Sequence, residues 1–129
     1  MTQENQELLL KDLCGRTQHG VKCQVYDFSI PYTLSGIIPS RPYQELYFEE
    51  LDYKECNGFV DIKHCKPYLF PLSSMTEEQR DEFDRLYTYD ALIVEPQWEL
   101  IDFCDKHHLD YRGLIPMGLA EDATNLNIY

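Results

Sequence analysis

The sequence predicts one α+β domain, in which an N-terminal helix precedes a small bent antiparallel sheet and two acidic C-terminal helices follow it. Leucines at helical spacing open the chain, and short β-prone segments then recur at intervals of about ten residues. Two amphipathic stretches occupy the second half. A length of 129 residues gives room for a single domain.

The first element is a helix over residues 4–14. Leu9, Leu10 and Leu13 cluster on one side of that helix. Thr2 is a suitable N-cap, because its hydroxyl can accept a hydrogen bond from the first helical turn. Gly15 is predicted to end the helix as a C-cap glycine.

Four strands are predicted next, over residues 21–25, 32–38, 45–50 and 59–63. The first alternates apolar and polar side chains, which is typical of a half-buried strand. Asn57-Gly58 marks a turn before the last of them. Four or five short strands at this spacing favour an SH3-like, partly open barrel.

The second half is predicted to be helical. Two prolines keep residues 67–74 extended, and a capping box at Thr76–Gln79 then begins a helix that runs to about Tyr87. Another helix begins near Pro96 and ends near His107, and a mostly irregular tail follows. We therefore divide the domain, residues 1–129, into a strand half (1–73) and a helical half (74–129).

Charge separates these halves. The chain has 23 acidic and 11 basic residues, a formal net charge of -12. By our count, residues 71–129 hold thirteen of the acidic residues and four of the basic ones. Such a field repels phosphate backbones, so we expect no direct nucleic-acid binding and favour a partner with a basic surface.

The sequence also predicts where the protein works. It has no apolar run of about 20 residues, which a membrane span needs. The acidic start, Met1-Thr2-Gln3-Glu4, is unlike the basic beginning of a signal peptide. Five cysteines without a regular spacing are expected to be reduced thiols, most of them buried. We therefore expect a soluble, cytoplasmic protein that does not bind membranes.

Three segments of the sequence are distinctive. They are LKDLCGR at residues 10–16, KPYLFPLSSMTEE at residues 66–78 and HLDYRGLIPMGLA at residues 108–120. Together they resemble small uncharacterised proteins from phages, prophages and mobile elements of Bacteroidetes. That group often has a basic residue in place of Phe70 and an aromatic one in place of Leu109. The resemblance implies a phage or mobile-element setting inside a bacterial cell, and it implies no catalytic residues.

The leading functional hypothesis is non-catalytic binding of a host protein through an acidic surface, as in a counter-defence inhibitor or a nucleic-acid mimic. An acidic field speeds the encounter with a basic partner. The predicted surface consists of acidic side chains on the two C-terminal helices: Glu77, Glu78, Asp81, Glu82, Asp84, Glu99, Asp102 and Asp105.

Tyrosines of the strand half indicate an alternative function. Tyrosine is enriched at protein interfaces and also stacks on nucleobases. We therefore consider a small-ligand or nucleotide-binding module whose surface includes Tyr26, Tyr32, Tyr43 and Tyr47. A sheet stabilised by pairs of aromatic side chains would use the same residues structurally.

Cys104, His107 and His108 raise two further alternatives. They could contribute to a metal site completed by His64 and Cys65, although the spacing fits no familiar zinc pattern. They could also form the Cys–His pair of a hydrolase. We expect Cys104 to be a core thiol instead, and we expect neither a cofactor nor an enzymatic activity, because no catalytic or phosphate-binding motif is present.

Overall fold

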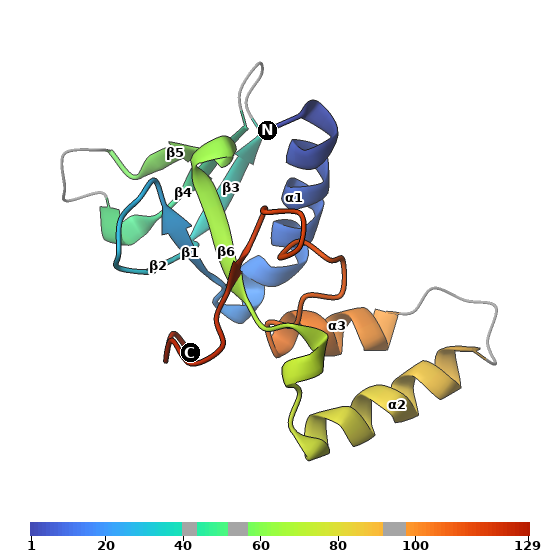
Figure 1. Cartoon of the computed structure of the whole chain (residues 1–129). Helices are drawn as coiled ribbons and strands as arrows, with labels where there is room; N and C mark the ends of the chain where they lie inside the picture. The colour runs from blue at the N-terminus through green and yellow to red at the C-terminus, as the bar shows by residue number, and fades with distance from the viewer. Residues whose placement is uncertain (40–43, 52–56, 92–97) are drawn as a thin grey trace.

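The computed structural model describes residues 1–39, 44–51, 57–91 and 98–129 and confirms the mixture of helices and antiparallel strands. Helix α1 opens the chain, strands fill its middle, and helices α2 and α3 follow (Figure 1). The elements are α1 (Gln3–Arg16), β1 (Lys22–Val25), β2 (Tyr32–Thr33), β3 (Gly36–Pro39), β4 (Gln44–Tyr47), β5 (Phe59–Asp61), β6 (Cys65–Leu69), α2 (Glu77–Ala91), α3 (Trp98–Lys106) and β7 (Glu121–Asp122).

Helix α1 begins as predicted but ends later. The Asn5 amide donates to Thr2 Oγ1 over 3.1 Å, which confirms the N-cap. The prediction that Gly15 caps the other end is wrong, because the helix continues to Arg16 and its C-cap is Thr17. Gly15 instead lies close to the side chain of Asp105 in α3.

The strands form two sheets. One has the order β2-β1-β6-β7 and the other the order β3-β4-β5. Neighbouring strands are antiparallel except β6 and β7, which are parallel. Over the residues that the structure describes, these strands do not close into a barrel.

Two strand predictions need correction. The segment 32–38 contains two strands, β2 and β3, which belong to different sheets because the chain leaves the first sheet after Thr33. The segment 67–74, expected to be merely extended, contributes the end of β6. Its proline Pro67 lies opposite Cys23 in the register of β1 and β6, so a central strand accommodates it.

The hydrophobic core joins α1 to both sheets. Leu9 and Leu13 of α1 pack with Cys23 of β1, Leu46 of β4 and Leu69 of β6, all of them fully buried. Residues 114–120 close the same core from the C-terminal segment. The N-terminal helix and the chain end thus share one apolar interior.

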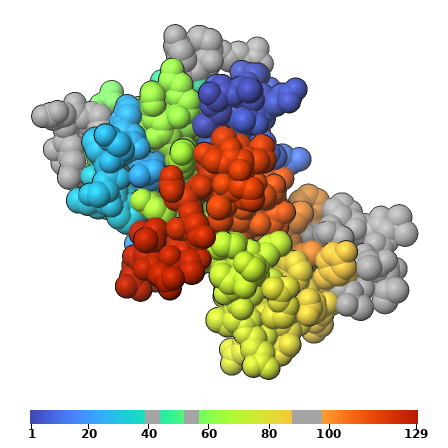
Figure 2. Space-filling view, viewed as in Figure 1, coloured from blue at the N-terminus to red at the C-terminus, as the bar shows by residue number. Residues whose placement is uncertain are grey.

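Helices α2 and α3 pack on each other and form a lobe beside the sheets (Figures 1 and 2). The capping box is confirmed, since Thr76 Oγ1 accepts from the Gln79 amide at 3.1 Å and Gln79 Oε1 accepts from the Thr76 amide at 3.0 Å. Helix α2 runs beyond Tyr87 to Ala91, and the predicted start at Pro96 lies outside the described residues. No helix in the described part of the chain is long and apolar enough to cross a bilayer.

Candidate functional site

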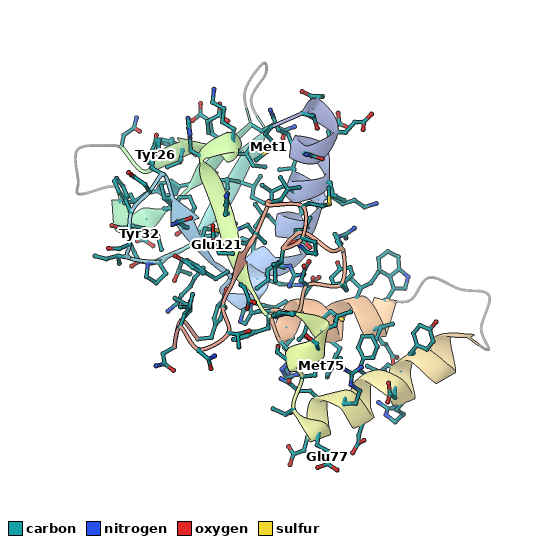
Figure 3. The ribbon with its side chains drawn as sticks, in the orientation of Figure 1. Met1, Tyr26, Tyr32, Met75, Glu77 and Glu121 are labelled. Carbon is teal, nitrogen blue, oxygen red and sulfur yellow. The ribbon has the colours of Figure 1, made fainter. Side chains whose placement is uncertain are left out.

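The acidic residues of α2 lie largely at the surface. Four of the predicted residues, Glu77, Glu78, Asp81 and Asp84, are exposed. Figure 3 shows Glu77 at the tip of the lobe, far from the sheets. Helix α2 contains six acidic and two basic residues, so its charge is strongly negative.

Among the side chains that the structure describes, one carboxylate of α2 forms an ion pair. Arg85 donates to both carboxylate oxygens of Glu82, through Nη2 at 2.5 Å and through Nε at 3.0 Å. The i, i+4 spacing of Asp81 and Arg85 predicts a pair between these two residues, and the pair with Glu82 replaces it. The same spacing predicts a pair of Arg80 with Asp84, but Arg80 donates to the Leu72 carbonyl at 3.1 Å. Most of the negative charge of α2 therefore faces solvent.

Helix α3 adds only two residues to this acidic surface. Glu99 and Asp102 are exposed, and Asp102 lies 3.3 Å from Nε2 of His19. The assignment of Asp105 to the surface is wrong, because its side chain is 5% exposed. It faces α1 instead, where Arg16 Nε lies 3.8 Å from its Oδ1 atom.

Asp105 belongs to a buried network of ion pairs. Arg16 and Asp12 are completely buried and joined by a 2.8 Å hydrogen bond from Arg16 Nε to Asp12 Oδ2. Arg112 Nε donates to the other oxygen of Asp12 at 3.2 Å. The Arg112 guanidinium also lies 4.8 Å from the centre of the Tyr111 ring. Two carboxylates thus balance two guanidinium groups inside the protein.

Burial dominates the electrostatics of Asp105. It raises the pKa of that carboxyl above its usual range, and the charge of Arg16 opposes the rise. Gly15 makes the burial possible, because a Cβ atom at Gly15 would lie 2.5 Å from Oδ2 of Asp105. Any larger residue at this position would force the Asp105 carboxylate to shift.

The three distinctive segments of the sequence meet around this network. Arg16, in the first segment, donates through Nη2 to the Leu109 carbonyl in the third segment at 2.6 Å. Phe70, in the second, donates its amide to the His108 carbonyl and accepts from the Asp110 amide, each at 2.8 Å. The segments are thus linked by buried contacts rather than by a shared open surface.

Sequence reasoning missed Asp12 and Arg16, although a signal was present. Leu9, Asp12, Leu13 and Arg16 follow the spacing i, i+3, i+4 and i+7, and all four are buried. Opposite charges four residues apart within an apolar helical stripe indicate a buried ion pair. From the sequence, Arg112 of the C-terminal tail is expected to bind the acidic helices. This expectation is wrong, because its partner Asp12 belongs to α1.

The candidate metal and hydrolase residues have other environments in the structure. Cys104 is buried, as predicted, and burial raises the pKa of its thiol to about 11. His107 Nδ1 lies 3.4 Å from Gln79 Nε2, whereas the ring of His108 stacks on Tyr129. Within the described residues, no three His, Cys, Asp or Glu side chains are grouped to hold a metal.

Of the four tyrosines predicted to form an aromatic surface, Tyr26 is exposed and lies beside Phe28 and His64. Tyr32 is buried, the half-buried Tyr47 packs on Phe59 with ring centres 5.0 Å apart, and Tyr43 lies outside the described residues. Figure 3 places Tyr26 and Tyr32 at the opposite end of the molecule from Glu77.

Tyr26 has an unusual backbone conformation. Its φ of 53° is in the left-handed region, which bulky residues rarely adopt. Its ring centre lies 4.9 Å from that of His64 and 5.7 Å from that of Phe28. A hollow of about 330 Å³ adjoins Phe28, and its wall consists of Phe28, Ser29, Ile30 and the predicted site residue Tyr32. Exposed rings next to a hollow can stack on a flat ligand.

A second pocket, of about 200 Å³, lies between α2 and α3. Its wall is almost entirely apolar or aromatic and includes Phe83, Tyr87, Leu100, Ile101, Cys104 and Tyr111. The rings of Phe83 and Tyr87 are stacked, with an angle of 11° between their planes. This pocket is therefore an apolar opening within the acidic lobe.

Comparison with known proteins finds no similar protein: no family model, no curated protein and no solved structure matches this chain.

Proposed function

We propose that this protein is a non-catalytic binding protein, which recognises a basic surface on another protein through the exposed carboxylates of α2 and of the beginning of α3. The observation that carries the proposal is the concentration of exposed negative charge on α2, which has six acidic and two basic residues. Glu77, Glu78, Asp81 and Asp84 are all exposed, and the nearby Arg85 pairs with Glu82 instead.

The position of α2 supports the same function. The helix belongs to a lobe beside the sheets, so a partner can approach it without displacing the core (Figure 2). Exposed charges act over about 8 Å at physiological ionic strength, and clustered charges of one sign accelerate association with an oppositely charged surface. Salt is therefore expected to weaken this binding.

A phage or mobile-element setting would indicate which kind of protein the basic partner is. The resemblance of the three segments to such proteins would make the basic partner a host protein that handles or cleaves nucleic acid. An acidic helix then imitates the charge of the phosphate backbone, as a counter-defence inhibitor would. The buried thiol of Cys104 also argues against a Cys–His hydrolase, because a nucleophilic cysteine needs an accessible thiolate.

The test is affinity purification from the native cell at low and high salt, using two variants of equal charge. The first carries Glu77→Gln, Glu78→Gln, Asp81→Asn and Asp84→Asn. The control carries Glu4→Gln, Glu7→Gln, Asp27→Asn and Glu49→Gln, which neutralise exposed carboxylates elsewhere.

We expect the wild type and the control to retain a basic protein at low salt and release it at high salt, and the α2 variant to retain none. Equal retention by both variants, or retention that salt does not change, would show that α2 is not the binding surface.

A second candidate function rests on Tyr26. Its left-handed backbone and its contacts with Phe28 and His64 favour a site for a flat ring, such as a nucleobase. Thermal-shift measurements with nucleotides test it, because a ligand at 100 times its Kd stabilises the folded state by about 2.7 kcal/mol. A shift that disappears in Tyr26→Ala would support this function, and the absence of any shift would exclude the nucleotides tested.

A further inference from the structure

The pocket between α2 and α3 is smaller than a typical ligand site. Its volume is about 200 Å³, whereas pockets for drug-sized ligands occupy about 300–1,000 Å³. The hydroxyl of Tyr111 already accepts a 2.9 Å hydrogen bond from Arg112 Nη2. A pocket of this size, lined mostly by carbon, suits one apolar side chain better than a polar metabolite.

The surroundings of the pocket match an interface. Tyr87, in its wall, is 57% exposed, and Trp98, three residues before the lining residue Ile101, is 70% exposed. Tyrosine and tryptophan are enriched among the residues that dominate binding energy at interfaces. Asp84 is exposed and lies between the lining residues Phe83 and Tyr87 in α2.

We propose that the pocket between α2 and α3 receives one apolar side chain from a basic, amphipathic segment of the partner, while the carboxylates of α2 bind the basic residues that flank this side chain. This inference rests on the proposed function, because it assumes that α2 is the binding surface. It adds the chemistry of the recognised segment: lysine or arginine residues around a central apolar anchor.

Charge complementarity selects this occupant. A neutral apolar segment would fill the pocket but leave the carboxylates of α2 without partners, and an acidic one would be repelled by them. A purely basic segment would pair with the carboxylates and leave the apolar wall in contact with water. Only a segment with both features satisfies the whole surface.

The test uses two synthetic peptides and the full chain. Both peptides are helix-forming sequences of lysine and alanine, about 18 residues long, and they differ only by leucine or alanine at the central position. Anisotropy of a dye on the peptide gives Kd. The emission of Trp98, the single tryptophan of the chain, reports binding at the lobe.

The expected result is that the leucine peptide binds about tenfold more tightly than the alanine peptide, since burial of its additional carbons is favourable. Both affinities fall with salt. Tyr87→Ala removes a wall and Ile101→Phe fills the pocket, so each variant should reduce the tenfold preference to nearly one. Leu126→Ala, which removes an exposed apolar side chain outside the lobe, is the control and should keep it.

The two proposals fail in different ways. Equal, salt-sensitive binding of both peptides would overturn the inference about the pocket and leave the acidic surface supported. A tenfold preference that survives in both pocket variants would overturn it as well. If neither peptide binds in a salt-dependent manner, the acidic surface itself is contradicted, and the inference falls with it.

Discussion

Gly15 lies where helix α1 passes the carboxylate of Asp105, and this contact reverses the usual preference for alanine over glycine in a helix. In an open helix, Gly→Ala gains about 1 kcal/mol. In this protein the new Cβ would lie 2.5 Å from Oδ2 and 3.3 Å from Cγ of Asp105. We therefore predict that Gly15→Ala lowers the free energy of unfolding by about 1–3 kcal/mol, measured by urea denaturation.

Lys11→Ala is the control for Gly15→Ala, because Lys11 is an exposed residue of the same helix. Its free energy of unfolding should change by less than about 0.5 kcal/mol. A stability of Gly15→Ala equal to or above that of the wild type would mean that α1 and α3 separate easily at this point.

His108 is predicted to make stability depend on pH. Burial, followed by the charge of Arg16, lowers the pKa of its imidazole from the ordinary value of 6.5 to about 4 in the folded protein. Between these values the unfolded chain binds more protons than the folded one, so the free energy of unfolding falls as the pH falls from about 6.5 to 4. Allowing for partial exposure, we expect a loss of about 1–2 kcal/mol.

His108→Asn tests this prediction by urea denaturation at several pH values. Asparagine tolerates the left-handed backbone of this position, where φ is 58°. The variant should lose less stability than the wild type between pH 6.5 and 4, and the exposed control His64→Asn should retain the dependence of the wild type. An unchanged slope in His108→Asn would assign the pH dependence to other groups.

Individual residues were predictable where their role is local. The N-cap Thr2 and the buried thiol Cys104 were identified from their immediate neighbours in the sequence. The burial of Asp105 was not, because it depends on Gly15 and Arg16 of a helix some ninety residues earlier. A carboxylate on a polar helical face gives no local sign that another helix covers it.

At the level of elements, helix α2 depends on its capping box. It packs on α3, and the reciprocal hydrogen bonds between Thr76 and Gln79 fix its first turn. We predict that Thr76→Ala, which removes the acceptor of the Gln79 amide, costs about 1 kcal/mol. Amide hydrogen exchange should accelerate at the start of α2 and remain unchanged in α1.

Thr76→Ser is the matched control for this cap, since serine keeps the hydroxyl acceptor. It should preserve the exchange rates of the wild type. Fast exchange in both variants would indicate that the threonine methyl group, rather than the hydrogen bond, stabilises the beginning of α2.

Elements with strong local signals were predicted well, and those decided by distant partners were not. Helices α1 and α2 have caps and amphipathic patterns that identify their first turns. Strand β6 contains a proline and alternates poorly, since four of its five residues are buried. It lies between β1 and β7 in the sheet. The division of the strands into two sheets likewise depends on pairings that no short stretch of sequence encodes.

For the whole molecule, the excess of negative charge predicts that salt stabilises the fold. The net charge is -12, and the exposed carboxylates of α2 repel one another. Raising the salt concentration from about 0.01 to 0.1 M shortens the screening length from about 30 to 10 Å. We expect the free energy of unfolding to rise by about 0.5–1 kcal/mol.

The variant with four neutralised carboxylates on α2 should show a smaller rise than the wild type in the same urea titrations. Stability that falls with added salt would mean that attractive ion pairs outweigh the repulsion. In that case the acidic residues of α2 would have cations near them, and the proposed binding surface would lose its basis.

The candidate surface could be predicted in outline from the charge and the amphipathic pattern of α2, which together indicate its exposed acidic positions. The pocket beside it could not, because it is formed where α2, α3 and Tyr111 meet. The burial of Tyr32 and Tyr47 could not be predicted either, since the side of a strand that faces the core depends on which sheet the strand joins.

The buried hydrogen bond between Arg16 and the Leu109 carbonyl spans 93 positions of the chain. A nascent polypeptide cannot form it until most of its length has been synthesised, and contacts of such long separation slow folding. Until then, Arg16 and Asp12 lack the partners that α3 and Arg112 provide. A fragment that ends at residue 73 would expose these charges and would lack the core residues Leu114, Leu119 and Ala120. It should therefore be captured by chaperones or degraded by proteases rather than accumulate.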